Sequence, residues 1–95
     1  MPKAYWIANV TVTDPVAYKD YQTIAPAAFI EFGARFLARG EAETLEGQPW
    51  QRRVIIEFDS LEQALACYNS PEYRSAREKR AGACEADIAI IEGLA

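Results

Sequence analysis

The residue best suited to proton transfer is Glu57, which stands between Ile56 and Phe58 in a strand-like run. A carboxylate among apolar neighbours has its ionised form disfavoured and can then act as a general acid or base. A structural ion pair with Arg39, or with a residue of a partner subunit, is the alternative, since such pairs also perturb titration. Glu57 is therefore the predicted catalytic residue, with the ion pair left open.

Two arginines are candidates for holding an anion. Arg35 and Arg39 alternate with Leu37, so we expect both side chains on one face of a strand. A guanidinium that faces a cavity can clamp a carboxylate or phosphate through two hydrogen bonds. Asn9, expected on the same face, would orient a ligand carbonyl. The alternative for the arginines is a salt bridge at a dimer interface.

Tyrosines on apolar helix stripes are further candidates. Tyr18, Tyr21 and Tyr68 follow helical spacing with other apolar residues. Such tyrosines more often pack in the core, with the hydroxyl reaching the surface or a backbone group. The substrate-binding candidates kept from this set are Tyr18 and Tyr68. Trp6 is expected in the core, whereas Trp50 is expected to close a cavity mouth or to bury into a partner.

The composition excludes several kinds of chemistry. The chain has no histidine, which removes the commonest general base and the commonest zinc and haem ligand. Cys67 and Cys84 fit no metal or redox spacing and are expected to be packing residues. No cofactor and no metal are therefore predicted. Two free thiols in a chain without a recognisable secretory signal favour the cytoplasm.

Charge and hydropathy argue against two classes of partner. The chain has 10 Lys and Arg against 14 Asp and Glu, a formal net charge of -4. This balance gives no long-range attraction to nucleic acid or anionic lipid. No apolar run approaches the roughly 20 residues that span a bilayer. The basic run from Arg74 to Arg80 is interpreted as a solvated helix face.

The elements that must position these residues follow from turn and cap signals. Strands are predicted over 4–13, 35–45, 52–59 and 86–91, with a bend or bulge at Gly40. Asp14 and Pro15 start a helix that Gly33 ends and that Pro26 kinks or breaks. A capping box of Ser60 and Gln63 starts a second helix, which restarts at 70–71 and runs to about 81.

The order of these elements predicts one α+β domain over residues 1–95. Two β-α-β units joined by a hairpin fold as a ferredoxin-like β-α-β-β-α-β domain, with a four-stranded antiparallel sheet. The sheet face away from the helices would mix apolar with polar residues: Tyr5, Ile7, Asn9, Leu37, Arg39, Ile55 and Glu57. Such a face needs a cover, and a second copy of the chain is the simplest one. We therefore predict a homodimer.

Several segments resemble the uncharacterised family called domain of unknown function 1330. They are YWIA at 5–8, DP at 14–15 with Tyr18, GARFLARG at 33–40, VIIEF at 54–58, ACY at 66–68 with SPEY at 70–73, and AD at 86–87 with EG at 92–93. The resemblance covers essentially the whole chain. It implies a dimeric α+β barrel, a superfamily that includes cofactor-free monooxygenases, lactone isomerases and haem enzymes. The haem members use a histidine ligand, which this chain lacks.

Two hypotheses of function follow. In the first, the protein is a cofactor-independent enzyme or binder for a small anionic organic molecule, held between helices and sheet next to the dimer interface. Glu57 would move a proton, Arg39 would hold the anion, and Asn9 or a tyrosine would polarise a carbonyl or hydroxyl. In the second, the protein is a non-catalytic structural or stress-related homodimer whose polar residues serve the interface.

Overall fold

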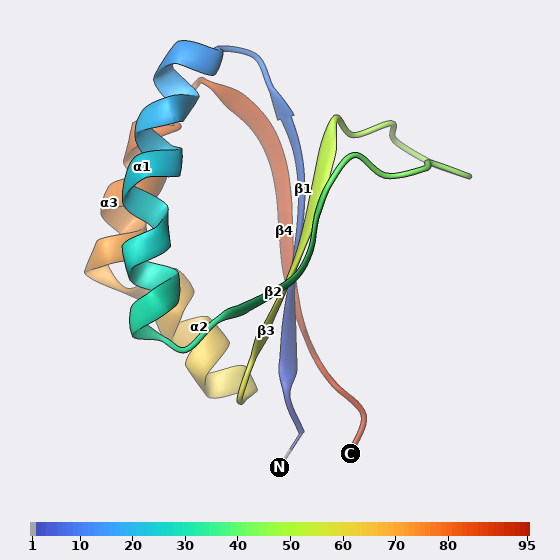
Figure 1. Ribbon diagram of the computed structural model, residues 1–95, viewed down its shortest axis with the longest axis vertical. Helices are drawn as coiled ribbons and strands as arrows, with labels where there is room; N and C mark the ends of the chain where they lie inside the picture. Colours follow the sequence, from blue (N-terminus) through green and yellow to red (C-terminus); the bar gives the residue numbers. More distant parts are fainter. Residues whose placement is uncertain (1) are drawn as a thin grey trace.

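Four antiparallel strands form one sheet, and three helices lie against one of its faces (Figure 1). These elements come from a computed structural model that describes residues 2–95. The spatial order β2-β3-β1-β4 is that of the predicted ferredoxin-like α+β domain. The elements are β1 (Ala4–Val12), α1 (Pro15–Glu31), β2 (Arg35–Gly40), β3 (Arg52–Phe58), α2 (Leu61–Asn69), α3 (Pro71–Lys79) and β4 (Cys84–Glu92).

The core lies between the helices and the sheet and is centred on Trp6. The indole packs edge-on against Phe29 at 5.2 Å and Tyr73 at 5.0 Å, and is stacked on Phe58 at 5.9 Å between ring centroids. The expected alternation of β1 is confirmed, because its residues at 4, 6, 8 and 10 are buried while their neighbours are half-buried. The aromatic pairs fix the distance between α1, α3 and the sheet.

Helix α1 begins as predicted but is continuous through its proline. Asp14 Oδ1 accepts a hydrogen bond from the Ala17 amide at 3.2 Å. Of the two expected effects of Pro26, a kink or a break, the break is wrong, since the helix extends to Glu31. Pro26 removes one bond to the Gln22 carbonyl, but both residues are exposed, so water can satisfy that carbonyl.

The second helical segment restarts at Ser70, as predicted. Ser70 Oγ accepts from the Tyr73 amide at 3.1 Å and donates to the Cys67 carbonyl at 2.7 Å, so one side chain joins the two helices. Ser60 also caps as expected, accepting from the Gln63 amide at 3.1 Å. The Gln63 side chain does not reach back to Ser60. It donates instead to the Phe32 carbonyl and satisfies the end of α1.

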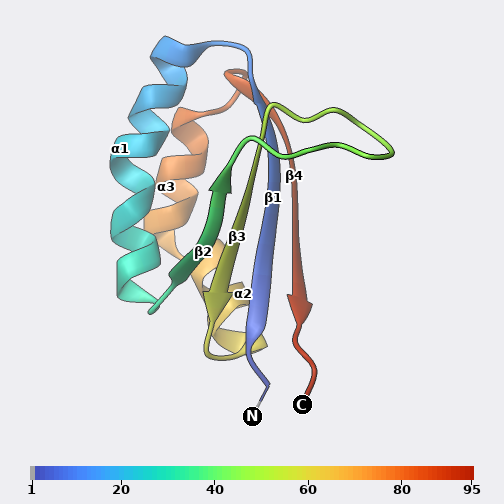
Figure 2. The same ribbon diagram turned by 45° about the vertical axis from the view of Figure 1, so that its right-hand side comes forward.

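Strand β2 is shorter than predicted, ending at Gly40 and not at residue 45. Gly40 has a φ of 140°, which side-chain-bearing residues rarely adopt, and it forms the last pair with β3, opposite Arg53. Residues 41–51 then form a loop that extends away from the helices (Figure 2). The predicted turn at 46–49 lies inside this loop, and so does Trp50.

The irregularity of β2 lies at Leu37 and not at Gly40. Phe36 pairs with Ile56 whereas Ala38 pairs with Ile55, so Leu37 is an extra residue in the ladder. A bulge of one residue reverses the side-chain alternation that follows it. Arg35 therefore projects from the uncovered face, while Arg39, which pairs with Val54, projects toward the helices. The expectation that both arginines share a face is wrong.

The sheet face opposite the helices is uncovered and mixed in polarity. It carries exposed apolar side chains, with Ile55 37% and Ile91 58% exposed. Tyr5, Asn9 and Glu57 lie on the same face. The predicted composition of this face is confirmed, except that Arg35 takes the place expected for Arg39.

Candidate functional site

A cavity of about 140 Å³ lies between the sheet and helix α1, beside the C-terminal end of α3. All four strands contribute to its wall, and so does Arg80, the C-cap of α3. Its lining residues are Trp6, Ala8, Val10, Tyr18, Tyr21, Gln22, Ala25, Pro26, Phe29, Phe36, Arg39, Arg52, Val54, Ile56, Arg80 and Ile88. Apolar walls with a few polar groups are typical of a small-molecule site.

One part of the cavity wall is aromatic. Phe29 from α1 contacts the Trp6 indole of β1 edge-on at 5.2 Å and the Phe36 ring of β2 edge-on at 5.4 Å. Phe36 faces the cavity because it precedes the bulge and pairs with the buried Ile56. This wall suits the flat face or edge of a ring.

Three arginines also line the cavity, and none of them has a carboxylate partner. The ion pairs among residues 2–95 involve only Lys3 and Arg35 as cations. Arg39 lies over the Phe36 ring at 5.2 Å, and Arg80 lies over the Tyr21 ring at 5.1 Å. Arg52 is the third arginine of the cavity lining. With no Asp or Glu among the lining residues, the cavity is strongly positive.

Arg80 has a buried nitrogen without a partner. Its Nε lacks a hydrogen-bond partner in the described chain, and its Nη1 donates to the Cys84 sulfur at 3.6 Å. A sulfur atom is a weak acceptor. Expecting Arg80 on a solvated face is therefore wrong, because the side chain is half-buried in the cavity wall.

Two tyrosine hydroxyls add hydrogen-bond donors. Tyr18 and Tyr21 both line the cavity, and the Tyr21 hydroxyl lies 2.8 Å from that of Tyr73. Burial, followed by the nearby Tyr73 hydroxyl, raises the pKa of Tyr21 above its ordinary value. Burial also raises the pKa of Tyr18. Both are thus protonated at neutral pH and offer a proton to a ligand.

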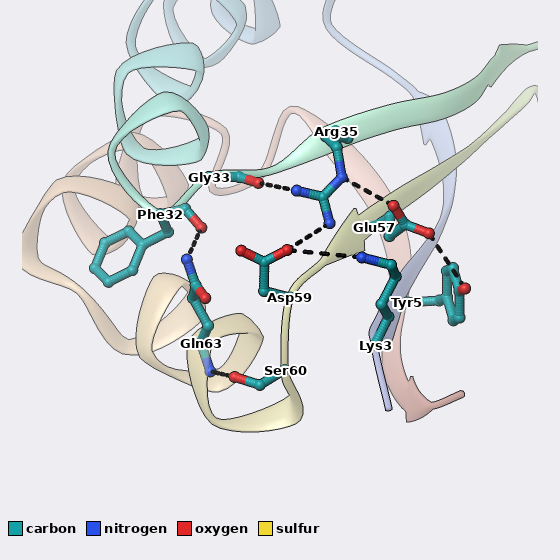
Figure 3. Close-up of polar contacts among 9 residues, drawn as sticks. All are labelled: Lys3, Tyr5, Phe32, Gly33, Arg35, Glu57, Asp59, Ser60 and Gln63. Carbon is teal, nitrogen blue, oxygen red and sulfur yellow. Dashed lines mark hydrogen bonds and ion pairs between the residues drawn. The ribbon is translucent and has the colours of Figure 1, made fainter. Parts of the chain in front are cut away.

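Glu57 lies on the opposite face, in a polar network that Figure 3 shows. Its carboxylate accepts from Arg35 Nε at 2.8 Å and from the Tyr5 hydroxyl at 3.2 Å, and Arg35 also bonds Asp59 at 2.8 Å. The hydrogen bond from Arg35, opposed by desolvation and aided by Tyr5, lowers the pKa of Glu57. The expectation of a disfavoured charge is wrong: Glu57 is an ion-paired carboxylate, and its partner is Arg35, not Arg39.

The cavity brings together only part of the predicted set. Tyr18 and Arg39 line it, whereas Asn9, Arg35 and Glu57 lie on the uncovered face. Tyr68 is outside the lining as well: its ring packs at 5.6 Å from that of Trp6, and Arg77 covers it at 4.6 Å.

Sequence reasoning missed three residues of the cavity. The alternation that assigns Val54 and Ile56 to the helix face also assigns Arg52 to it, so Arg52 carried a usable signal. Tyr21 shared an apolar stripe with Tyr18 and was set aside as core. Arg80 follows the last turn of α3, where helical spacing no longer predicts which way a side chain points. The sequence therefore contains no signal that Arg80 lines the cavity.

Two kinds of feature are absent from the part of the chain that the structure describes. No group of three or more potential ligands that could hold a metal is present among residues 2–95. None of the helices in this range is both long and apolar enough to cross a bilayer. Burial raises the pKa of Cys67 to about 12, which fits its predicted packing role.

Comparison with solved structures identifies the same fold in other proteins. A protein of unknown function from Rhodopseudomonas palustris matches with a TM-score of 0.79 at 19% identity, over 99% of this chain and 84% of that one. A dimeric ferredoxin-like protein of unknown function from Bacteroides fragilis matches with a TM-score of 0.66 at 18% identity, over 95% of each chain. The cofactor-independent oxygenase SnoaB from Streptomyces nogalater matches with a TM-score of 0.68 at 8% identity, over 100% of this chain and 96% of that one. At these identities the likeness establishes the fold alone.

The sequence comparison is more specific. No curated protein matches this chain. The model of one protein family matches residues 3–94, which is nearly the whole sequence. The chain therefore belongs to the family described as domain of unknown function (DUF1330).

Proposed function

We propose that this protein binds a small organic anion with a single ring in the cavity between α1 and the sheet. The observation that carries the proposal is the set of three guanidinium groups, Arg39, Arg52 and Arg80, around an apolar cavity without any carboxylate in its lining. Arg52 and Arg80 are half-buried, whereas Arg39 is exposed. A half-buried cation without a partner is unfavourable, so an anionic ligand would offset that cost at Arg52 and Arg80.

The size of the cavity supports a one-ring ligand. An apolar cavity of about 150 Å³ is sufficient for a benzene molecule, and this one measures about 140 Å³. The ring would pack against Phe29 and Phe36, and its charged substituent would meet the arginines. Guanidinium groups bind carboxylates and other oxyanions through paired, charge-assisted hydrogen bonds.

A reaction without a cofactor is compatible with this site, by analogy with the solved oxygenase of the same fold. Glu57 lies outside the cavity, and the lining contains no histidine or carboxylate. Any proton taken from a substrate would therefore pass to water and not to a protein base. A purely structural or stress-related dimer, the alternative from the sequence, leaves the unpaired arginines unexplained.

We also propose that the protein forms a homodimer through its uncovered sheet face. Exposed Leu37, Ile55 and Ile91 support this, and so do the dimers reported for solved proteins of the same fold. The cavity would then lie on the far side of the sheet from the interface. The free thiols of Cys67 and Cys84 fit a cytoplasmic location.

Thermal unfolding with two matched ligands tests the binding proposal. Benzoate at ten times its Kd is expected to raise Tm by about 6 °C or more, whereas uncharged benzyl alcohol at the same concentration has a much smaller effect. Arg80→Met and Arg52→Met should abolish the difference between the ligands. Arg74→Met, an exposed arginine of α3, is the matched control and should retain it. Equal effects of both ligands on the natural sequence would refute the proposal.

A further inference from the structure

We infer that the cavity takes weakly acidic ring hydroxyl compounds, phenols and enols, and holds them as oxyanions at a subsite formed by Tyr21 and Arg80, with Tyr73 as a positioning residue. This inference rests on the proposed function and names the ligand class of the same cavity. Three observations carry it: a paired set of hydroxyls, an unsatisfied guanidinium and a lining that lacks an acidic group.

The first observation is the hydrogen bond between two tyrosines. Tyr73 is fully buried and does not line the cavity, and its hydroxyl lies 2.8 Å from that of Tyr21, which does. Each hydroxyl has one proton to donate. If Tyr73 donates to Tyr21, the proton of Tyr21 is free to point elsewhere. An oxyanion in the cavity would select this orientation, and the chain from Tyr73 through Tyr21 to the ligand strengthens each bond.

The second observation is the position of Arg80. Its guanidinium lies 5.1 Å from the centre of the Tyr21 ring, so the cation and the hydroxyl donor belong to one part of the wall. Its Nε is buried and lacks a partner in the described chain. A ligand oxygen is a better acceptor than the Cys84 sulfur at 3.6 Å.

Further positive charge lies near this subsite. Arg52 and Arg80 both act electrostatically on the Tyr18 hydroxyl, which lines the same cavity. Tyr18 packs against Tyr21 at 5.3 Å between ring centres. The Tyr21–Arg80 subsite therefore lies beside a second protonated hydroxyl, that of Tyr18, and a second cation, Arg52. A nearby opposite charge favours the ionised form of an acid by about 1–3 pKa units.

The proton balance of binding follows from the lining. A neutral phenol that binds as its phenolate loses the hydroxyl proton, with the O–H electron pair remaining on the ligand oxygen. The lining contains no carboxylate and the chain has no histidine, so the proton is released to water and buffer. Between the lowered pKa of the bound ligand and the pKa of the free ligand, binding should thus release protons and tighten as pH rises.

The coloured phenol 4-nitrophenol tests this inference, because its anion is yellow and its neutral form is not. Its absorbance, free and bound, is titrated against pH, and benzoate affinity is measured in parallel. We expect the pKa of the bound probe to fall by about 1–3 units, so that the anion binds about 10- to 1,000-fold more tightly than the neutral form.

Substitutions test whether the subsite causes the lowered pKa of bound 4-nitrophenol. Tyr21→Phe should return the pKa of the bound probe toward its free value, and Tyr73→Phe should do so to a smaller extent, although Tyr73 does not line the cavity. Tyr5→Phe, a hydroxyl on the uncovered face, is the control and should leave the bound probe unchanged. If Tyr73→Phe fails to fold, Tyr21→Phe still tests the inference, because Tyr21 is only half-buried and its substitution is better tolerated.

The outcomes separate the two proposals. Failure of both benzoate and 4-nitrophenol to bind refutes the proposed function itself. Binding of benzoate together with a 4-nitrophenol pKa that is unshifted, or unaffected by Tyr21→Phe, refutes the oxyanion subsite alone. A lowered pKa that depends on Tyr21 and on Tyr73 supports the inference.

Discussion

At the scale of single residues, the ion-paired network around Arg35 contrasts with the arginines of the cavity. On the uncovered face, Arg35 bonds both Glu57 and Asp59, so these three charges are matched. In the cavity, the arginines have no acidic partner among residues 2–95. Matched ions serve structure, whereas unmatched ions in an apolar cavity indicate a site for an anion.

The pH dependence of stability should reflect the ion pair between Glu57 and Arg35. The pKa of Glu57 is lowered in the folded state, so its contribution is present above the ordinary glutamate value of about 4.3 and is lost as pH falls through the folded pKa. Glu57→Gln should therefore have a lower Tm than the natural protein at pH 6, and the gap should close in more acidic solution. The measurement is Tm against pH for both proteins.

The same variant separates structure from binding. Because Glu57 is outside the cavity, Glu57→Gln should leave the Kd for benzoate unchanged within about twofold, a difference below about 0.5 kcal/mol. A large loss of affinity would mean that Glu57 reaches the ligand after all. Glu57 itself illustrates the limit of sequence reasoning: its strand and its face were correct, but its ion-pair partner depended on the pairing of β2 with β3, which the sequence does not display.

At the scale of elements, the helix caps and turns could be predicted from the sequence, whereas the bulge in β2 could not. Asp14, Ser60 and Ser70 all cap helices as predicted, since capping depends on residues three positions apart. The bulge at Leu37 depends on how β2 pairs with β3, and nothing in the local sequence distinguishes it from the glycine at 40. That one residue turns Arg39 into the cavity, so the site could be predicted only in part.

The junction of α2 and α3 provides a test at this scale. Ser70→Ala removes the acceptor for the Tyr73 amide and the donor to the Cys67 carbonyl, and should destabilise the protein by about 1–2 kcal/mol. The matched control is Ser75→Ala, an exposed serine inside α3, which should change stability by less than about 0.5 kcal/mol. Urea unfolding measures both. Equal effects of the two substitutions would contradict the capping role.

At the scale of the whole molecule, one layer of helices leaves one sheet face without a cover. The sequence predicted this face because four strands and their helices leave no further element to place on it. The proposed cover is a second copy, which would bury Leu37, Ile55 and Ile91. Ring-binding and dimerisation would then use opposite faces, so each can be disrupted without the other.

A charge placed on the uncovered face tests the dimer. Ile55→Glu should shift the protein to monomers, because a carboxylate buried in an apolar interface is strongly unfavourable. Ile30→Glu is the control: Ile30 lies on α1 and is 78% exposed, so this substitution should leave the assembly unchanged. Analytical ultracentrifugation distinguishes the two. Dimers that persist in Ile55→Glu would place the interface elsewhere.

The most direct measurement of the central claim is a crystal structure of the protein with 4-nitrobenzoate. We expect the ring to lie against Phe29 and Phe36 inside the cavity, with the carboxylate in hydrogen-bond contact with Arg52 or Arg80. A ligand found only on the uncovered sheet face, or an empty cavity at a saturating concentration, would contradict this expectation.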